Sequence, residues 1–581
     1  MNELKWWQKS IVYQIYPKSF QDTTGTGVGD IPGVTSHLDY LKSLGTGAIW
    51  LTPVYPSPMV DNGYDISDNC GIDPSYGTME DMEELIAEAK KRDIRIVMDL
   101  VFNHSSDQHP WFLESKKDRT NPKADWYIWR DAKPDGSAPT NWRAIFGGSA
   151  WTWCEERQQY YLHTFAEAQP DLNWENPEVR QALFDAANFW LDKGVGGFRI
   201  DAIVYIKKPE FKDGPVDGAD GLSGIHEMTA NTPGILDFLH EFRRKVFDGH
   251  DIFTVGEANG VSPEELPQWV GKDGVFSMLF EFSHLELSYP EGEIWCKRFA
   301  WKLSQLKDAL SASQAATAKE GWYPIFFENH DQNRSMHRYF PEGTDPKVAA
   351  KALATVLFTL RGTPFVYEGE EIGMTNTAFP KIEDYNDIST HGQYEYAIKE
   401  GLSPEEALKA VQFQSRDNAR TPMQWTRETN AGFTTGKPWL PVHKDFTDCC
   451  VEAESEDGTS VLSYYRQMNR ERTEGKASAI LLQGSYEELL HEDEHVYAFK
   501  RVLGEHATYT VVNFTNDTVT YDSSVLEDAD VLIGNYENAK KGTLRPAEAF
   551  VYVKLGHARC VGEIRYWRAA SRRRYRRHSG P

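Results

Sequence analysis

The chain has 581 residues and a mass of 66.3 kDa, which is too long for one ordinary domain, so we expect two or three domains. Its formal net charge of −25 opposes binding to nucleic acid or to anionic membranes and favours neutral ligands or cations. Aromatic residues make up 13% of the chain and provide rings for stacking on a small ligand. We therefore expect a small-molecule ligand and no nucleic-acid or membrane partner, in a monomer or homodimer.

The six cysteines show no paired spacing and no zinc-type cluster, so free thiols are expected. The N-terminus lacks an apolar signal core, and no later run approaches the roughly 20 apolar residues of a membrane helix. These observations predict a cytoplasmic protein.

Short apolar runs alternate with helix-patterned segments through most of the chain. Runs typical of buried strands cover residues 11–16, 48–51, 94–102, 197–203, 252–256, 275–282, 323–327 and 364–367. Apolar residues at helical spacing occupy segments between them, at 79–92, 177–193, 234–246 and 347–360. This alternation predicts an α/β fold with a parallel (β/α)8 TIM barrel.

Two segments break the alternation. Residues 105–172 are rich in Trp, Asp, Asn, Pro and Gly with little periodicity, which predicts a subdomain inserted after strand three. Beyond residue 480, short alternating strands at 495–500, 508–514 and 549–554 predict a C-terminal all-β sandwich domain. The barrel is thus expected over residues 1–104 and 173–480, the inserted subdomain over 105–172 and the β domain over 481–555.

The last segment, residues 556–581, holds eight Arg and one Glu in an otherwise acidic chain. One interpretation is a basic arm for nucleic acid or membrane. We favour a disordered or non-native extension, because its composition does not match the rest of the protein.

Three carboxylates each close a short apolar run: Asp201, Glu257 and Asp331. The strand ends of a parallel barrel converge on one pocket, so acids at three strand ends can meet there. A helix cap or an ion pair would explain any one of these acids alone, but explains all three together poorly. Paired carboxylates suit the cleavage of a glycosidic bond.

The neighbours of these acids suggest divided roles. Arg199 lies two residues before Asp201, so both side chains point to the same face of the strand. The guanidinium should lower the pKa of Asp201 and keep it ionised, as a nucleophile requires. Glu257 follows an apolar run, where burial should raise its pKa toward that of a general acid. A separation of about 5 to 5.5 Å between the two carboxyl groups would give a covalent intermediate and retention of configuration.

His330 precedes Asp331, and the pair can hold two adjacent sugar hydroxyls, so Asp331 is expected to stabilise the transition state rather than to attack. His104 has a comparable hydrogen-bonding role available, although a lone histidine is usually structural. Two other enzyme classes are disfavoured because the chain has neither the Gly-x-Ser-x-Gly elbow of a serine hydrolase nor a phosphate-binding P-loop.

Four dispersed motifs, at residues 99–104, 197–201, 255–257 and 329–331, resemble those of glycoside hydrolase family 13, the α-amylase family. Within it, segments 14–20, 62–68, 169–174 and 415–425 are similar to the oligo-1,6-glucosidase and α-glucosidase group. The resemblance covers about residues 5–555. It implies an exo-acting retaining α-glucosidase with a pocket closed at its non-reducing end, and with some transglucosylation.

The resemblance also places several residues around the sugar. Asp61 and Tyr64 should lie near the terminal sugar, with Arg416 closing over it. Phe146 and Phe165 should form apolar walls, although packing in the core would equally explain them. The candidate substrate-binding residues are therefore Asp61, Tyr64, His104, Phe146, Phe165, Gln169, Arg199, Ala202, His330 and Arg416.

Ala202, directly after the expected nucleophile, bears on the linkage. In the group that the chain resembles, Val at this place accompanies α-1,6 preference, whereas Ala or Thr accompanies activity on α-1,4 bonds. The resemblance therefore favours maltose and short maltooligosaccharides, with sucrose or isomaltose as secondary substrates. The alternatives are an oligo-1,6-glucosidase, a transglucosylase or sucrose-active enzyme of the family and, remotely, a non-catalytic binding protein. Trehalose-6-phosphate hydrolysis is disfavoured because the acidic chain offers no obvious basic patch for a phosphate.

Two stretches depart from the family pattern. A loop of Asp22, Thr24, Thr26, Val28 and Asp30 stands where the family has its calcium loop, but with Thr where Asn and Asp are usual. It predicts at most a weakly bound structural calcium or magnesium ion, and we expect the reaction to need no cofactor. The acidic segment 289–297 stands where sucrose isomerases of this group carry an Arg-rich motif, which disfavours isomerisation.

Overall fold

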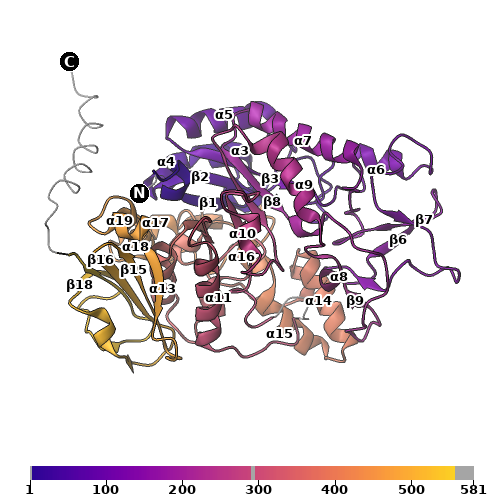
Figure 1. Ribbon diagram of the computed structural model, residues 1–581. Coiled ribbons are helices and arrows are strands. Elements are labelled where there is room, and N and C mark those ends of the chain that lie inside the picture. The colour runs from indigo at the N-terminus through magenta and orange to yellow at the C-terminus, as the bar shows by residue number, and fades with distance from the viewer. Residues whose placement is uncertain (1–2, 290–294, 557–581) are drawn as a thin grey trace, which may run out of the picture.

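The computed structural model describes residues 3–289 and 295–556. Eight parallel strands form its centre, in the order β11-β10-β8-β3-β2-β1-β13-β12 (Figure 1). They are β1 (Ile11–Ile15), β2 (Thr46–Leu51), β3 (Arg95–Val101), β8 (Gly197–Asp201), β10 (Phe253–Glu257), β11 (Met278–Phe280), β12 (Pro324–Ile325) and β13 (Thr363–Tyr367). The end strands β11 and β12 contact each other, so the sheet is a nearly closed barrel, and the predicted fold class is confirmed.

The barrel strands are buried on both faces because helices cover their outer side. β1, β8 and β13 are buried along their whole length, as is typical of parallel strands between two packed layers. The helices that cover them are α3 (Ile31–Ser36), α4 (Leu38–Ser43), α5 (Met79–Lys91), α7 (Pro177–Asp192), α9 (Ile235–Phe242), α10 (Leu266–Trp269), α11 (Leu303–Ala316), α13 (Pro346–Thr359) and α18 (Val461–Thr473). Polar caps set several starts: Thr78 and Asp81 form a capping box at α5, and Asp345 caps α13 before Pro346.

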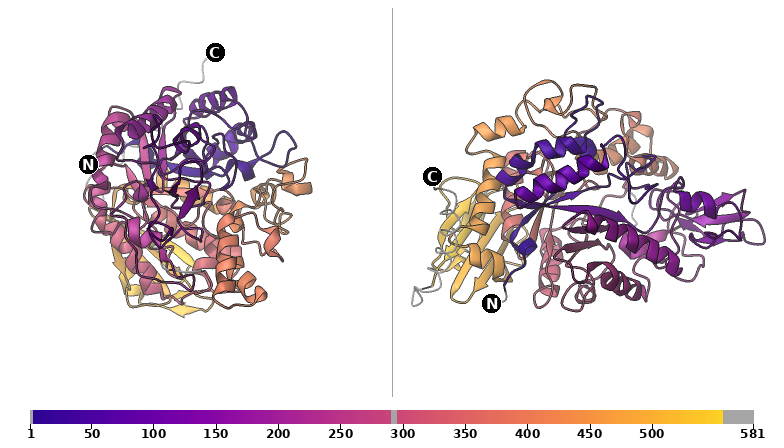
Figure 2. Two further views of the ribbon diagram at one scale, coloured as in Figure 1. Left: turned by 90° about the vertical axis from the view of Figure 1, so that its right-hand side faces the viewer. Right: turned by 90° about the horizontal axis from the view of Figure 1, so that it is seen from above.

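A small antiparallel sheet follows β3. It contains β4 (Trp129–Arg130), β6 (Trp151–Cys154) and β7 (Gln159–Leu162), in the order β4-β7-β6, after the short helix α6 (Pro110–Ser115). A further strand, β5 (Trp142–Arg143), pairs with β9 (Ser223–Gly224) from the segment after β8. In both Figure 1 and the right-hand view of Figure 2 this sheet lies at one end of the molecule, with the C-terminal sheet at the other.

A helical region that the sequence pattern did not indicate follows β13. It contains α14 (Ile388–Lys399), α15 (Pro404–Gln414), α16 (Asp417–Arg420) and α17 (Val451–Glu456) before α18 and α19 (Ser478–Gln483). Helices α14 and α15 pack against each other. Figure 1 shows them near α8 (Ile225–Thr229) and β9, so this excursion borders the same mouth of the barrel as the inserted segment.

The C-terminal region is an antiparallel β domain. Five strands, β14 (Ser485–Leu489), β15 (Val496–Leu503), β16 (His506–Asn513), β18 (Asp530–Gly534) and β20 (Ala549–Lys554), form one sheet in the order β14-β15-β16-β20-β18. A second sheet of β17 (Val519–Thr520) and β19 (Thr543–Leu544) packs over it around a core that includes Val511, Leu544 and Tyr552. Apart from Gly556, the basic segment 556–581 lies outside the described residues, as does Cys560.

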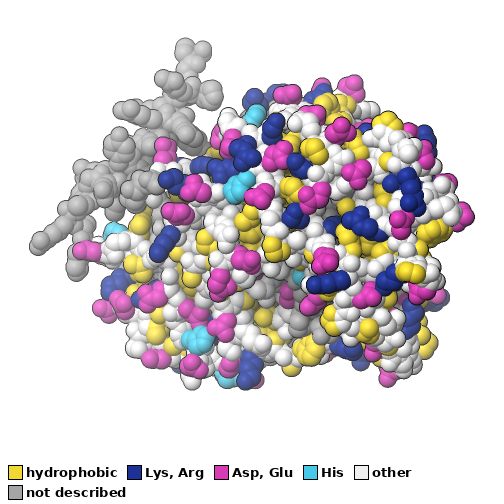
Figure 3. All heavy atoms as spheres, turned by 45° about the vertical axis from the view of Figure 1, so that its right-hand side comes forward, with side chains coloured by type: hydrophobic (Ala, Val, Ile, Leu, Met, Phe, Trp, Pro, Cys, Tyr) yellow, Lys and Arg dark blue, Asp and Glu magenta, His cyan; other side chains and the backbone are white. Residues whose placement is uncertain are grey.

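Two further observations concern the described part of the chain. Its five cysteines, at positions 70, 154, 296, 449 and 450, are all free thiols. None of the helices in residues 3–289 and 295–556 is long and apolar enough to cross a membrane. Acidic and basic side chains are interspersed over the face shown in Figure 3.

Candidate active site

A pocket of about 340 Å³ lies at the carboxyl ends of the barrel strands. Asp201 is the last residue of β8, Glu257 is the last residue of β10, and Asp331 follows β12 by six residues. All three line the pocket, as do seven other predicted residues: Asp61, Tyr64, His104, Phe146, Phe165, Ala202 and Arg416. The remaining three, Gln169, Arg199 and His330, are buried behind the lining, where they hold its side chains in place.

Arg199 joins the two acids that the sequence assigned to nucleophile and general acid. Its Nη1 donates to Oδ1 of Asp201 at 2.5 Å, and its Nη2 donates to Oε2 of Glu257 at 2.7 Å. Nη1 also binds Oδ1 of Asp99 at 2.9 Å, so three carboxylates share one guanidinium that is 1% exposed. The backbone N–H of Ala202 donates to the same Oε2 of Glu257 at 3.0 Å. Strands β8 and β10 are neighbours in the sheet, which is why these side chains meet.

Burial dominates the titration of these acids. It raises the pKa of Asp201 to about 7, although Arg199 acts in the opposite direction. The prediction that Arg199 holds the pKa of Asp201 low is therefore wrong, because one guanidinium shared by three carboxylates cannot offset their desolvation. Burial also raises the pKa of Glu257 to about 7, as predicted for a general acid. The two acids thus compete for a proton near neutral pH.

Asp331 lies in a different electrostatic setting. Burial acts to raise its pKa, but His330, Arg416 and Arg420 outweigh burial and hold that pKa well below the usual range. His330 Nε2 lies 3.0 Å from Oδ2 of Asp331, and Arg420 Nη2 donates to Oδ1 at 2.8 Å. The ring of His330 is itself stacked on Tyr64, with ring centroids 5.1 Å apart. Asp331 is therefore an anion that accepts hydrogen bonds, in keeping with a role in binding.

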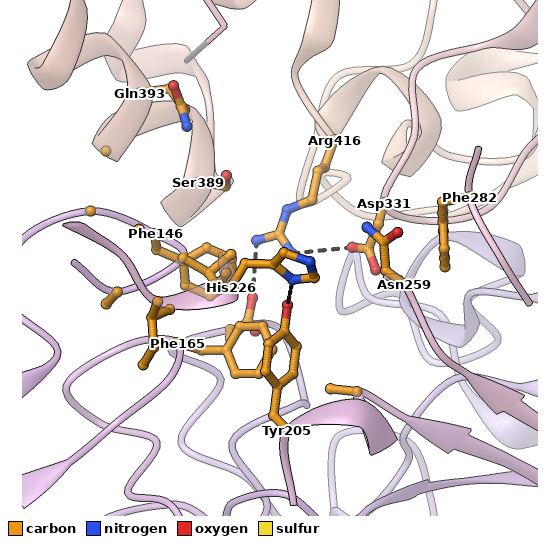
Figure 4. A pocket seen from close by; sticks show the side chains of 18 of the residues that line it. Phe146, Phe165, Tyr205, His226, Asn259, Phe282, Asp331, Ser389, Gln393 and Arg416 are labelled. Atoms are coloured by element: carbon orange, nitrogen blue, oxygen red, sulfur yellow. Dashed lines mark hydrogen bonds and ion pairs between the residues drawn. The ribbon is translucent and has the colours of Figure 1, made fainter. Parts of the chain in front are cut away.

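The inner end of the pocket is closed by ion pairs. Arg416 reaches Oδ1 of Asp331 at 3.1 Å (Figure 4). It also reaches Oδ1 of Asp61 at 3.0 Å. Gln169 Nε2 donates to the other oxygen of Asp61 at 3.1 Å and lies 3.2 Å from His104 Nε2. Asp61 is 4% exposed and Arg416 is 7% exposed, so this end of the pocket is sealed from solvent.

Sequence reasoning missed Asp387, the third carboxylate on Arg416. It is fully buried, accepts from Nε of Arg416 at 2.8 Å and caps α14 through the N–H groups of Ser389 and Thr390. An Asp directly before a helix reads as an ordinary cap, so only the position of Arg416 could have shown its second role.

Rings and polar groups form the side walls. Phe146 and Phe165 pack together with ring centroids 5.6 Å apart, and the guanidinium of Arg416 lies 4.9 Å from the ring of Phe146. Figure 4 shows the hydroxyl of Tyr205 directed at the ring of His226. The hydroxyl oxygen of Tyr205 lies 2.5 Å from Nδ1 of His226. Other lining residues that the sequence did not suggest include Asn259, Glu286, Ser389 and Gln393. Of these residues, Asn259 could most readily have been predicted from the sequence, because it follows the proposed acid Glu257 by two residues.

The loop of the predicted metal site fits a cation poorly. Asp22 accepts hydrogen bonds from the N–H groups of Thr24, Gly25 and Gly27 at 2.7 to 2.9 Å, and from the hydroxyl of Thr434 at 2.5 Å. Asp30 accepts from the backbone of Thr23 and Gly33 in the same way. Protein donors therefore occupy the oxygens that a hard cation would need. Among the described residues, no group of three or more His, Cys, Asp or Glu side chains is arranged to hold a metal ion.

Comparison with known proteins agrees with this geometry. Residues 14–484 match the family described as alpha amylase, catalytic domain. The oligo-1,6-glucosidase of Parageobacillus thermoglucosidasius is 44% identical over 562 residues, which cover 95% of this chain and 99% of the relative. The trehalose-6-phosphate hydrolase of Bacillus subtilis is 42% identical over 94% of this chain and 98% of the relative.

Solved structures give the same result. The isomaltulose synthase of Klebsiella sp. LX3 superimposes with a TM-score of 0.89 at 40% identity, over 95% of this chain and all of that one. The trehalose-6-phosphate hydrolase of Bacillus licheniformis superimposes with a TM-score of 0.88 at 40% identity, with the same coverage. With the three acids, the barrel and these relatives in agreement, the chain belongs to the α-amylase family and is a glycoside hydrolase.

Proposed function

We propose that this enzyme is an exo-acting, retaining α-glucosidase that releases glucose from the non-reducing end of maltose and other short α-glucosides. The observation that carries the proposal is the pocket itself. Asp201 and Glu257 lie on its wall under one guanidinium, and Arg416 closes its inner end across Asp61 and Asp331. A closed end admits one terminal sugar and leaves the rest of the substrate directed toward solvent.

In the first step, an ionised Asp201 attacks the anomeric carbon and forms a carbon–oxygen bond, while the bond to the leaving sugar breaks. Glu257 gives its proton to the departing oxygen. Arg199 and the Ala202 N–H both bind Oε2 of Glu257, so the transferred proton is expected on Oε1. Asp331 and His330 would hold the sugar hydroxyls, with bonds that strengthen as the ring flattens.

In the second step, Glu257 takes a proton from water, the water oxygen attacks the anomeric carbon, and Asp201 leaves as a carboxylate. Two inversions at the same carbon give net retention. A sugar hydroxyl that replaces the water would give transglucosylation. Neither step needs a metal ion.

Ala202 supports the α-1,4 assignment. It lines the pocket, and its N–H binds the proposed acid, which places this residue beside the reacting groups. A larger side chain there would narrow the space beside the leaving sugar. A second candidate, α-1,6 cleavage, is favoured by the fact that several relatives are named oligo-1,6-glucosidases.

The proposal is tested by initial rates of glucose release from maltose, isomaltose and sucrose at matched concentrations. We expect the highest rate with maltose and loss of all three activities in Asp201→Asn. A higher rate with isomaltose would replace the α-1,4 assignment by the α-1,6 one. Activity retained in Asp201→Asn would contradict the assignment of the nucleophile.

A further inference from the structure

The pocket wall next to Asp331 carries an amide group that is held from behind. Gln332 follows Asp331 directly, lines the pocket and is partly exposed. Its Oε1 accepts a hydrogen bond at 2.7 Å from Nη2 of Arg338. Arg338 belongs to α12 (Ser335–Tyr339), is 5% exposed and lies outside the described pocket lining. The guanidinium therefore binds this amide from the protein side of the wall.

The bond to Arg338 determines which end of the Gln332 amide faces the pocket. A guanidinium can only donate hydrogen bonds, whereas a Gln amide accepts at its oxygen and donates at its nitrogen. The oxygen of Gln332 must therefore face Arg338, which leaves Nε2 as the amide atom for a ligand in the pocket. Within residues 3–289 and 295–556, no group accepts a hydrogen bond from this nitrogen. The wall thus presents an N–H donor at this position.

Arg338 is itself held in place. Its Nη2 also donates to Oδ1 of Asn333, which is fully buried. The Nδ2 of Asn333 in turn donates to the backbone oxygen of Phe413 at 3.1 Å. Two amide oxygens from consecutive residues therefore fix the guanidinium, so the orientation of Gln332 is set before a ligand binds.

Gln332 and Arg338 lie on the leaving-group side of the pocket. Burial lowers the pKa of Arg338, and Glu286, which lines the pocket, is among the groups that act in the opposite direction. The guanidinium is therefore near this carboxylate. Asn259, which follows the proposed acid Glu257 by two residues, donates to Oε1 of Glu286 at 2.7 Å. Because Glu257 gives its proton to the glycosidic oxygen, a donor on this side faces the leaving sugar.

We propose that Gln332 is a specificity-determining residue for the leaving sugar, with Nε2 donating to an oxygen of that sugar, and that Arg338 is the positioning residue that holds the amide in this orientation. A sugar offers hydroxyl oxygens as acceptors, whereas an aryl leaving group without polar substituents offers none. The donor should therefore favour α-glucosides of sugars over simple aryl α-glucosides. The inference rests on the proposed α-glucosidase activity and adds the recognition of the second half of the substrate.

The test compares a disaccharide with phenyl α-glucoside, whose leaving group has no oxygen besides the glycosidic one. The readout is the ratio of kcat/KM for maltose to kcat/KM for phenyl α-glucoside, taken within each variant so that differences in active fraction cancel. Isomaltose replaces maltose if the wild type cleaves it faster. Gln332→Met keeps the length of the side chain without the amide and should lower this ratio about fivefold, because one uncharged hydrogen bond is lost.

Arg338 is tested through the same ratio. Arg338→Met leaves the amide free to turn and should lower the ratio about threefold, whereas Arg338→Lys keeps a cation that can only donate and should retain more of it. Gln332→Met combined with Arg338→Met should give the same ratio as Gln332→Met alone, because Arg338 acts through Gln332. A merely structural role of Arg338 would lower kcat/KM for both substrates equally and leave the ratio unchanged.

Gln181→Met is the control, because it makes the same change at an exposed position of α7 outside the described pocket lining. Its ratio should equal that of the wild type. A ratio that Gln332→Met leaves unchanged would overturn the inference, as would a ratio that falls in Gln332→Met but not in Arg338→Met. Arg338→Gln, which can bind the amide with either of its own ends, takes the place of Arg338→Met if that variant does not fold. Wild-type enzyme that cleaves neither substrate would instead refute the proposed function, so the two failures are distinguishable.

Discussion

Arg199 Nη2 lies 2.7 Å from Oε2 of Glu257, and the other hydrogen bonds of this guanidinium go to two more carboxylates. One positive charge therefore serves three buried acids. This shortage of positive charge explains why burial can raise the pKa of both reacting acids to about 7. It also ensures that one proton is available to the pair near neutral pH.

The pH dependence of the reaction follows from these values. Asp201 must be ionised to attack, so activity should fall as pH drops below about 7. Glu257 must be protonated to act as the acid, so activity on maltose should also fall as pH rises above about 7. We expect a narrow bell for kcat/KM with maltose. With α-glucosyl fluoride, whose leaving group needs no proton, the high-pH limb should disappear. A high-pH limb that persists unchanged with the fluoride would show that it does not report Glu257.

The same pKa shift predicts a stabilising substitution. The folded pKa of Asp201 is about 7, above its ordinary value of 3.8, so ionising it weakens the fold as pH rises from about 4 to 7. Asp201→Asn removes this charge, so it should increase the free energy of unfolding at pH 8 by about 1 to 3 kcal/mol and raise Tm accordingly. The increase in both quantities should be smaller at pH 5. Thermal unfolding of both proteins across this pH range is the measurement. An equal gain at pH 5 and pH 8 would argue against the electrostatic explanation.

Much of the catalytic site could be predicted from sequence, because it follows strand periodicity. Asp201, Glu257 and Asp331 each close an apolar run, and parallel strands of a barrel bring such ends together. The titration of Asp201 could not be predicted in the same way. Its i−2 neighbour Arg199 is visible in the sequence, but the sharing of that guanidinium with Asp99 and Glu257 is a property of the folded barrel.

The outer wall of the pocket was the least predictable part. It includes Gly224 of β9, Ile225 and His226 of α8, and Ser389, Gly392 and Gln393 of α14, from regions with no strand pattern to place them. Asp387 illustrates the difficulty, because a helix cap and a partner for Arg416 are indistinguishable in sequence. The predicted metal loop shows the reverse case. Its oxygen-bearing residues look like ligands until the structure shows that Asp22 accepts from neighbouring N–H groups.

Asp387 should act through Arg416 rather than on the sugar directly. Asp387→Asn keeps the cap of α14 but weakens the ion pair that orients Arg416. KM for maltose should therefore rise about tenfold, with a smaller change in kcat, because one charge-assisted hydrogen bond is lost. Steady-state kinetics measure both constants. Asp384→Asn, at an exposed position three residues earlier, is the control and should behave as wild type. Loss of kcat alone in Asp387→Asn would contradict a positioning role in substrate binding.

Ala202 provides a direct test of linkage preference. Ala202→Val should lower the maltose-to-isomaltose ratio of kcat/KM by about tenfold, within the range of one or two methyl groups in a pocket. Because Ala202 has a φ of 43°, a β-branched side chain there should also destabilise the fold by about 1 to 3 kcal/mol. Ala202→Gly relieves the strain without adding volume and should not shift the ratio toward isomaltose. A maltose-to-isomaltose ratio of kcat/KM that stays constant in Ala202→Val would show that this residue does not determine linkage preference.

The loop at Asp22 should be stabilised by its hydrogen bonds rather than by a metal. We expect addition of EDTA to change Tm by less than about 1 °C, whereas Asp22→Ala leaves several N–H donors without their acceptor and should cost about 1 to 3 kcal/mol. Differential scanning calorimetry compares the two treatments. A large loss of Tm on chelation, restored by calcium, would establish a metal site here.

The most direct test of the central claim is the anomer of glucose released first from 4-nitrophenyl α-glucoside, whose leaving group is not a sugar, followed by proton NMR before mutarotation. An attack by Asp201 followed by attack of water requires α-glucose as the initial product. Initial release of β-glucose would mean a single inversion, and the assignment of Asp201 as a covalent nucleophile would be incorrect.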